Sequence, residues 1–167
     1  MTAVSFDDPE LLAFAEQARM VSLPPRADVL ARFSDMEIID AVVARDGGYL
    51  LETSSRGGAA HPVVSSTTLM PIRRELVLRL GAAARHRHRM PRFELPTALP
   101  ADFDLVERDD RAELTWQVAG EAMTVAFLTG QFAVNDALRF AQLARLPEAD
   151  LMAAYLDPAA RTPTLLQ

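Results

Sequence analysis

The sequence predicts a single α+β domain in which an antiparallel sheet, built from hairpin and meander units, packs against helices. Its 167 residues, half of them hydrophobic, have the size and composition of one globular domain. Residues 36–53 and 103–127 are rich in strand-forming side chains around tight-turn residues. Between them, residues 67–80 repeat apolar side chains at helical spacing. Shorter periodic segments predict an N-terminal helix and two short C-terminal helices.

The N-terminal segment, residues 1–34, is expected to be helical. Residues 6–20 repeat apolar side chains at helical spacing, one of the two aspartates before Pro9 can cap the helix, and Pro9 suits its first turn. After two consecutive prolines, residues 26–33 are expected to form a short second helix.

Residues 36–53 are predicted to form a β-hairpin. Its turn is the sequence Arg-Asp-Gly-Gly at 45–48, because Asp-Gly and Gly-Gly readily adopt the positive φ that tight hairpins require. The next stretch, residues 54–66, lacks the glycine patterns that bind phosphates and is interpreted as a connecting loop, or a partner-contact loop, with a short strand at Val63–Val64.

The central helix is expected to begin at one of two threonines, Thr67 or Thr68, with Pro71 in its first turn. Its buried stripe has the spacing i, i+3, i+7 and i+11, and comprises Leu69, Ile72, Leu76 and Leu80. Three arginines lie off this stripe and are expected to face water: Arg73, Arg74 and Arg79. Gly81 either ends the helix or lies within a helix that continues into an arginine run.

Residues 103–127 are predicted to form a three-stranded meander, because apolar side chains alternate along them between two turns at 108–111 and 119–121. Two short helices follow, from about Val134 to Leu143 and from Pro147 onward. Asp157–Pro158 ends the second, and residues 157–167 are expected to form a tail.

Charge is distributed unevenly along this acidic chain, whose formal net charge is −6. Residues 67–100 carry a net +5, whereas residues 1–66 carry −5 and residues 101–167 carry −6. An acidic whole argues against nucleic-acid binding, which needs a cationic surface. The absence of cysteine excludes disulfides and cysteine-ligated metals. Because the sequence shows neither a secretory signal nor an apolar run long enough to cross a membrane, the protein is expected to be cytoplasmic.

No catalytic motif is present, so the candidate functional residues are chosen from charge and turn chemistry and are assigned to partner binding. Arginine presents a planar donor fork to carboxylates and phosphates. The basic run is therefore either a solvated helix end, a contact for an acidic protein partner or a site for a small anion. The candidates are Arg85, His86, Arg87, His88 and Arg89 in the run, Asp109, Asp110 and Arg111 in an acidic turn, and Arg56, Gly57 and Gly58 in the glycine loop.

Metal, cofactor and catalytic roles are not expected. The adjacent arginines would repel a cation from His86 and His88. Adjacent carboxylates on an exposed turn, such as Asp109 and Asp110, are usually solvated and do not acquire the perturbed pKa of a catalytic acid.

The order of features resembles that of a known class of proteins. The segments are DGGYLLETSSRGG, TTLMPIRRELVLRLGAAARHRHRMPRF, an antiparallel stretch around LTWQV, and a final pair of helices ending YLDP. Over roughly residues 35–160 they resemble actinobacterial immunity proteins of polymorphic toxin systems, in particular the family of the immunity factor for tuberculosis necrotizing toxin. The resemblance implies a cytosolic inhibitor, without cofactor or catalytic residue, that binds a cognate toxin domain and occludes its active site. That family's toxin resembles an NAD-hydrolysing enzyme.

Two other classes of function remain compatible with the sequence. A small acidic α+β protein can act as a secretion or folding chaperone for an exported partner, and an arginine run can serve an enzyme of a small anionic metabolite. A chaperone binds an unfolded or N-terminal segment of its client, whereas an immunity protein binds the folded toxin domain.

Overall fold

One antiparallel sheet and four α-helices form the protein in the computed structural model, which describes residues 4–162. The strands lie in the order β1-β2-β3-β4-β5-β8-β7-β6. Their bounds are β1 Val21–Ser22, β2 Val29–Ser34, β3 Ile38–Arg45, β4 Gly48–Ser55, β5 His61–Ser66, β6 Phe103–Arg108, β7 Arg111–Val118 and β8 Glu121–Phe127. The helices are α1 Pro9–Gln17, α2 Leu69–Arg87, α3 Ala133–Leu143 and α4 Glu148–Leu156, with the 3₁₀ turn η1 Gly130–Phe132 before α3. The predicted α+β class is confirmed.

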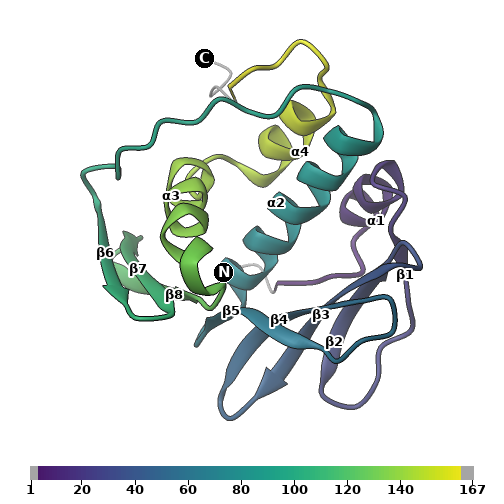
Figure 1. Ribbon diagram of the computed structural model, residues 1–167, viewed down its shortest axis with the longest axis horizontal. Coiled ribbons are helices and arrows are strands. Elements are labelled where there is room, and N and C mark those ends of the chain that lie inside the picture. Colours follow the sequence, from purple (N-terminus) through teal and green to yellow (C-terminus); the bar gives the residue numbers. More distant parts are fainter. Residues whose placement is uncertain (1–3, 163–167) are drawn as a thin grey trace.

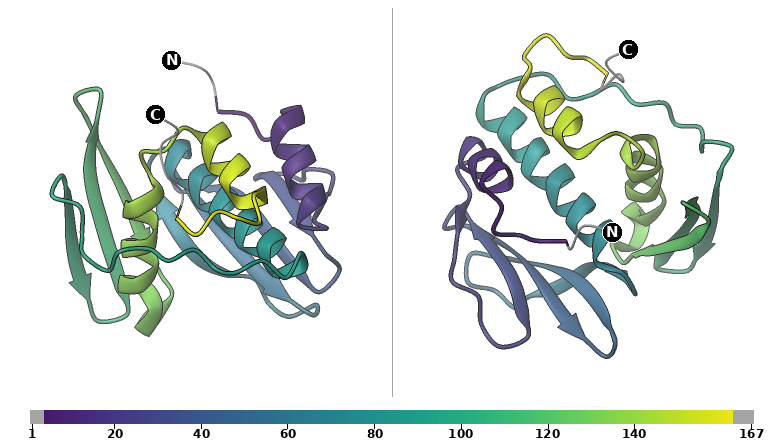
Figure 2. Two further views of the ribbon diagram at one scale, coloured as in Figure 1. Left: turned by 90° about the horizontal axis from the view of Figure 1, so that it is seen from above. Right: turned by 180° about the vertical axis from the view of Figure 1, so that it is seen from behind.

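The helices cover one face of the curved sheet (Figure 1). Helix α2 crosses the centre of the molecule, with α1 on one side and α3 and α4 on the other, an arrangement that Figure 2 shows from above and from behind. The connection from α2 to β6 runs past the ends of α4 and α3 to reach the wing of the sheet formed by β6, β7 and β8. This wing joins β1–β5 through the pairing of β5 with β8, at Val64–Phe127 and Ser65–Ala126.

The N-terminal segment is only partly helical. Asp8 caps α1, its carboxylate accepting a hydrogen bond from the amide of Leu11 at 2.9 Å. The prediction of a second helix over 26–33 is wrong, because most of that stretch is β2. Its side chains alternate, so Ala31 and Phe33 are buried against the helices and Arg32 is not. Pairing with β3 thus stabilises these residues as a strand, although their apolar spacing also fits a helix.

The two predicted sheet units are confirmed. In the β3–β4 hairpin, Asp46 and Gly47 form a two-residue turn with φ of 51° and 77°, the conformation that favours Asp-Gly at this position. Strands β6, β7 and β8 form the predicted meander. Strand β5 is longer than the expected strand at Val63–Val64.

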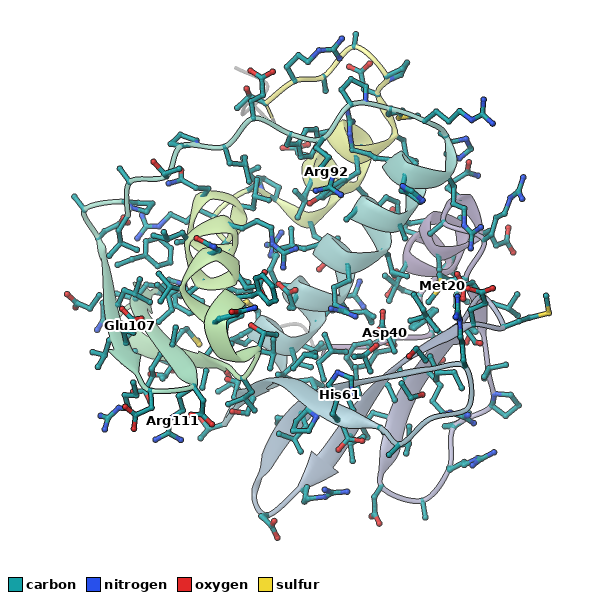
Figure 3. The ribbon with its side chains drawn as sticks, viewed as in Figure 1. Met20, Asp40, His61, Arg92, Glu107 and Arg111 are labelled. Atoms are coloured by element: carbon teal, nitrogen blue, oxygen red, sulfur yellow. The ribbon has the colours of Figure 1, made fainter. Side chains whose placement is uncertain are left out.

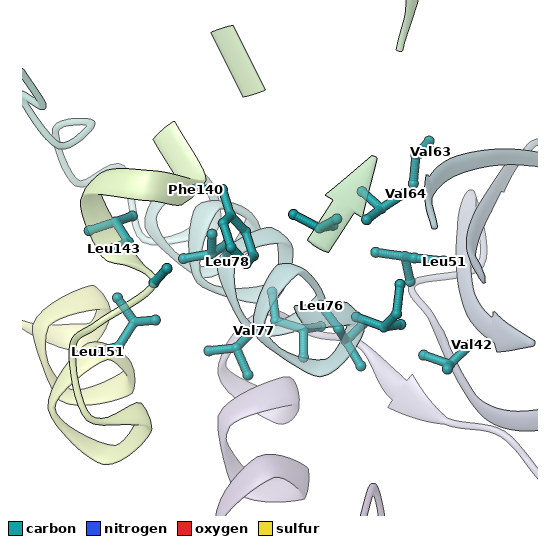
Figure 4. Packing of buried hydrophobic residues seen from close by; sticks show 14 of the residues in the cluster. Val42, Leu51, Val63, Val64, Leu76, Val77, Leu78, Phe140, Leu143 and Leu151 are labelled. Carbon is teal, nitrogen blue, oxygen red and sulfur yellow. The ribbon is translucent and has the colours of Figure 1, made fainter. Parts of the chain in front are cut away.

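Helix α2 organises the core (Figure 4). The side chains of Ile72, Leu76 and Leu80 are buried as predicted, and Val77 and Leu78 are buried as well, because neighbours surround the helix. The helix continues through Gly81, where a Cβ would lie 2.3 Å from Cγ of the Tyr155 ring. The α2 backbone can therefore approach α4 this closely only because residue 81 is glycine.

The expectation that three arginines of α2 face water is wrong. Arg73 pairs with Asp8 at 2.7 Å and also with Glu148. Arg79 pairs with Asp40, which is 4% exposed, at 2.8 Å. Arg74 is half-buried. The sheet and the other helices enclose α2 on nearly every side, so acidic side chains from those elements neutralise two of these arginines.

The two C-terminal helices are confirmed as α3 and α4, and Asp157 caps the end of α4. The predicted tail, 157–167, is described only as far as residue 162, and residues 163–167 lie outside the described part of the chain. No helix within residues 4–162 has both the length and the apolar composition that a membrane crossing requires.

Candidate partner-binding surface

Helix α2 ends with an arginine in a conformation that usually belongs to glycine. Arg89 has φ of 56°. Its amide donates to the carbonyl of His86 at 3.1 Å, and the amide of Met90 donates to the carbonyl of Arg85 at 2.8 Å. This hydrogen-bond pattern is the Schellman motif, whose left-handed position is most often occupied by Gly.

Helix α1 ends in the same way. Arg19 has φ of 58°, and its amide donates to the carbonyl of Glu16 at 2.9 Å. The amide of Met20 donates to the carbonyl of Ala15, also at 2.9 Å. Both helices therefore place an exposed arginine at the left-handed position and a methionine directly after it.

Two turns of the sheet hold long side chains in the same left-handed region. In the β2–β3 turn, Met36 has φ of 78° and is 96% exposed. Asp35 fixes this turn by accepting hydrogen bonds from the amides of Glu37 and Ile38 at 3.0 and 2.8 Å. In the β4–β5 turn, Arg56 and Gly57 have φ of 50° and 73°.

These four segments meet at one end of the molecule. Arg87, in the last turn of α2, pairs with Asp35 at 2.6 Å. The amide of Arg56 donates to the carbonyl of Glu37 at 2.6 Å. The ring of His88 lies 3.1 Å from the carbonyl oxygen of Gln17 at the end of α1. We call this surface the arginine end; it comprises Arg19, Met36, Arg56, Arg87, His88 and Arg89.

Backbone strain is concentrated at the arginine end. Seven residues other than glycine have positive φ within the described chain, and four of them have long side chains: Arg19, Met36, Arg56 and Arg89. All four are exposed and belong to this surface. The other three, Asp28, Asp46 and Ala119, have short side chains and lie at the opposite ends of the strands. The left-handed conformation costs a residue with a side chain about 1 kcal/mol or more, and such strain is typical of functional sites.

Most of the guanidinium groups at this end are free to bind. Arg19, Arg56 and Arg89 form no ion pair or side-chain hydrogen bond with any described residue. Arg87 is held by Asp35. Burial alone would raise the pKa of the Asp35 carboxyl, but the amide donors of Ile38 and Glu37, together with Arg87, outweigh it and keep the pKa below its ordinary value. Glu16 and Glu37 are also exposed here and pair with none of these arginines.

Arg85 does not belong to this surface, and the expectation that the whole run faces outward is wrong for this residue. Its side chain is 2% exposed, and the guanidinium lies over the Phe93 ring, 4.3 Å from the ring centroid. The guanidinium donates to the carbonyls of Pro91, Ala154, Tyr155, Asp157 and Ala160, at 2.7 to 3.3 Å. The last carbonyls of a helix lack partners within the helix. The five N–H donors of a guanidinium group can bind several such carbonyls at once. Arg85 thus fastens α2 to the end of α4.

The other predicted residues occupy different places. Arg56, Gly57 and Gly58 form the β4–β5 turn at the arginine end, and His86 is exposed on α2. The acidic turn lies on the other wing of the sheet, and Figure 3 shows Arg111 and Met20 on opposite sides of the molecule. Within that turn, Asp110 accepts a hydrogen bond through its carbonyl from the amide of Gly130 at 3.1 Å. The structure does not bring Asp109, Asp110 and Arg111 to the arginine end.

Arg19 and Met36 belong to the surface but were not predicted from the sequence. Arg19 directly follows Ala18, the C-cap of α1, at a position that is commonly left-handed, but the predicted helix extended through residue 20. The absence of glycine at that position concealed the helix end. Within residues 4–162 no group of three histidine, aspartate or glutamate side chains is placed to hold a metal ion.

The sequence model of the family described as Immunity protein 61 matches residues 14–162. The chain belongs to the Immunity protein 61 family. The resemblance to immunity proteins is confirmed at this level. No curated protein matches the sequence. Among solved structures, this Immunity protein 61 member has the fold of Rv3902c from M. tuberculosis, with a TM-score of 0.75 over 95% of each chain at 13% identity.

Proposed function

We propose that this immunity protein neutralises a cognate toxin by binding the folded toxin domain through the arginine end and covering its active site. The observation that carries the proposal is the convergence of four long, exposed side chains in left-handed conformations on one surface. A strained backbone conformation at an exposed side chain that has no partner within the described chain is consistent with a contact to another molecule. Membership of an immunity-protein family supports a toxin as that molecule.

The residue types of the arginine end indicate the kind of toxin surface that it can bind. Guanidinium groups bind carboxylates with two parallel hydrogen bonds, and a methionine adapts its unbranched side chain to an irregular apolar depression. The complementary toxin surface therefore combines acidic side chains around a shallow apolar pocket. Hydrogen bonds already fix the turn that carries Met36, so little conformational entropy is lost on binding.

The class of toxin follows from the sequence resemblance and not from the geometry. We propose an NAD-hydrolysing toxin domain as the target, which the immunity protein inhibits stoichiometrically without a cofactor or a catalytic residue. Inhibition by occlusion needs only a tight complex over the toxin's substrate cleft.

Co-expression tests this function. The probe is a candidate cognate toxin, the C-terminal domain of any secreted protein encoded beside this chain's gene, produced with and without the chain. We expect growth, and an unchanged cellular NAD level, only when the chain is present. Equal killing in both cases would refute immunity. Survival together with a falling NAD level would instead mean that the chain acts downstream of the toxin, which contradicts occlusion.

The binding mode separates immunity from chaperone activity. We expect the purified chain to bind the folded toxin domain in a one-to-one complex. Binding to the unfolded domain, or to an N-terminal segment of the secreted protein in place of the folded domain, would favour a chaperone.

A further inference from the structure

A cavity lies beside the arginine end, between the C-terminal half of α2, helix α4 and the covering segment 89–95. Its volume is about 570 Å³, which is within the range of small-molecule sites. Four arginines line it, Arg85, Arg89, Arg92 and Arg139, together with the aromatic residues Phe93 and Tyr155. Figure 3 shows Arg92 between the covering segment and the helices.

The cavity has an uncompensated positive charge. No aspartate or glutamate lines it. The buried Glu75 pairs with Arg139 at 2.5 Å and so neutralises that guanidinium. Arg85 directs its donors to main-chain carbonyls. Arg89 and Arg92, in contrast, are exposed and form no ion pair or side-chain hydrogen bond with any described residue. Two residues of the lining therefore carry a guanidinium group without a partner in residues 4–162.

The inner wall of the cavity is aromatic and apolar. The rings of Phe93 and Tyr155 lie 4.7 Å apart between centroids. Met90 and Leu95 from the covering segment add apolar lining. A cavity for an inorganic ion alone would not present this much apolar surface, and a neutral apolar ligand would leave the arginines without partners.

We infer that this cavity binds a small organic anion, with a carboxylate or phosphate held by Arg89 and Arg92 and a planar apolar body against Phe93 and Tyr155. Both anionic groups accept the two parallel hydrogen bonds that a guanidinium donates. The inference concerns a ligand other than the toxin, and Arg89 is the one residue that the cavity shares with the arginine end.

Calorimetry on the full chain at low salt tests this inference. Two anions serve as probes, benzoate for a carboxylate and adenosine monophosphate for a phosphate, each with its neutral counterpart, benzamide and adenosine. Inorganic phosphate tests the anion without a body. We expect at least one organic anion to bind with Kd below about 1 mM and roughly tenfold more tightly than its neutral counterpart and inorganic phosphate. Equal binding of charged and neutral probes, or no binding of either anion, would overturn the inference.

Two variants locate the site. Arg89 and Arg92 are exposed, so the double variant Arg89→Ala, Arg92→Ala should fold normally and weaken the best anion roughly tenfold or more. Arg26→Ala is the matched control, because Arg26 is an exposed arginine at the opposite end of β2 from the β2–β3 turn and should leave binding unchanged. If the anion binds the double variant as tightly as it binds the unaltered chain, its site lies elsewhere and the assignment to this cavity is wrong.

Discussion

Replacing Met36 by glycine should strengthen the fold and weaken the complex with the toxin. Met36 is 96% exposed and has φ of 78°, a conformation that glycine adopts without steric cost. The substitution removes a side chain that has almost no contact with its own protein. It keeps the hydrogen bonds of the turn, which Asp35 receives from the amides of Glu37 and Ile38.

The two effects have opposite signs and comparable sizes. Relief of the left-handed strain, after allowing for the greater freedom of glycine in the unfolded chain, should stabilise the fold by about 0.5–1 kcal/mol. For a chain of this length that corresponds to roughly 1–4 °C in Tm. Burying a methionine in an interface contributes about 1.5–3 kcal/mol. Its loss should weaken toxin binding about 10- to 100-fold.

Thermal unfolding and titration with the toxin domain measure the two effects. Ala119→Gly is the matched control, because Ala119 also has positive φ, at 51°, but lies in the β7–β8 turn away from the arginine end. This control should raise Tm and leave binding unaltered. If Met36→Gly binds the toxin like the control, Met36 is not a contact residue. A lower Tm for Met36→Gly would mean that its side chain packs in solution, which contradicts its exposure.

The remaining predictions concern the fold. Gly81→Ala should lower the free energy of unfolding, measured in urea, by about 1–3 kcal/mol, because the added Cβ would clash with the Tyr155 ring. A gain in stability from the higher helix propensity of alanine would show instead that the helices can separate enough to accept the methyl group. Arg85→Ala should lower the free energy of unfolding by about 2–4 kcal/mol, and Arg85→Lys should restore little of that stability, because one ammonium group cannot reach five carbonyls. If lysine restored the full stability, hydrogen bonding to several carbonyls would not be the role of Arg85. Asp8 and Asp35 have pKa values lowered from 3.8, so their carboxylates stabilise the fold fully above that pH and lose the contribution as pH falls through the lower folded-state values. The double variant Asp8→Asn, Asp35→Asn should therefore lose less stability in urea unfolding on acidification than the unaltered chain, and an identical acid dependence would contradict the assignment.

The sequence was sufficient to predict the elements that depend on residues close together in the chain. The Asp46–Gly47 turn needs positive φ at two adjacent residues, and few dipeptides supply it. The stripe of Leu69, Ile72, Leu76 and Leu80 repeats over about three helical turns, and its first step of three residues would place Leu69 and Ile72 on opposite faces of a strand. The family resemblance, carried by the order of such elements, was also readable from the sequence and agrees with the family match.

Packing between distant segments decided the rest. Residues 29–34 carry both a helical and a strand pattern, and the neighbouring β3 selected the strand. Arg85 belongs by sequence to an exposed basic run, yet its side chain is buried because the end of α4 lies beside it and carbonyls there accept its N–H donors.

The candidate site shows the same division. The sequence by itself predicted a basic run at or beyond the end of the central helix, and a connecting or partner-contact loop that contains Arg56 and Gly57. Only the tertiary structure placed these beside Arg19 and Met36, because an ion pair from α2 to the β2–β3 turn and a backbone hydrogen bond from the β4–β5 turn bring together segments separated by tens of residues. Periodicity and turn chemistry act over a few residues, whereas a binding surface depends on which ends of which elements the core aligns.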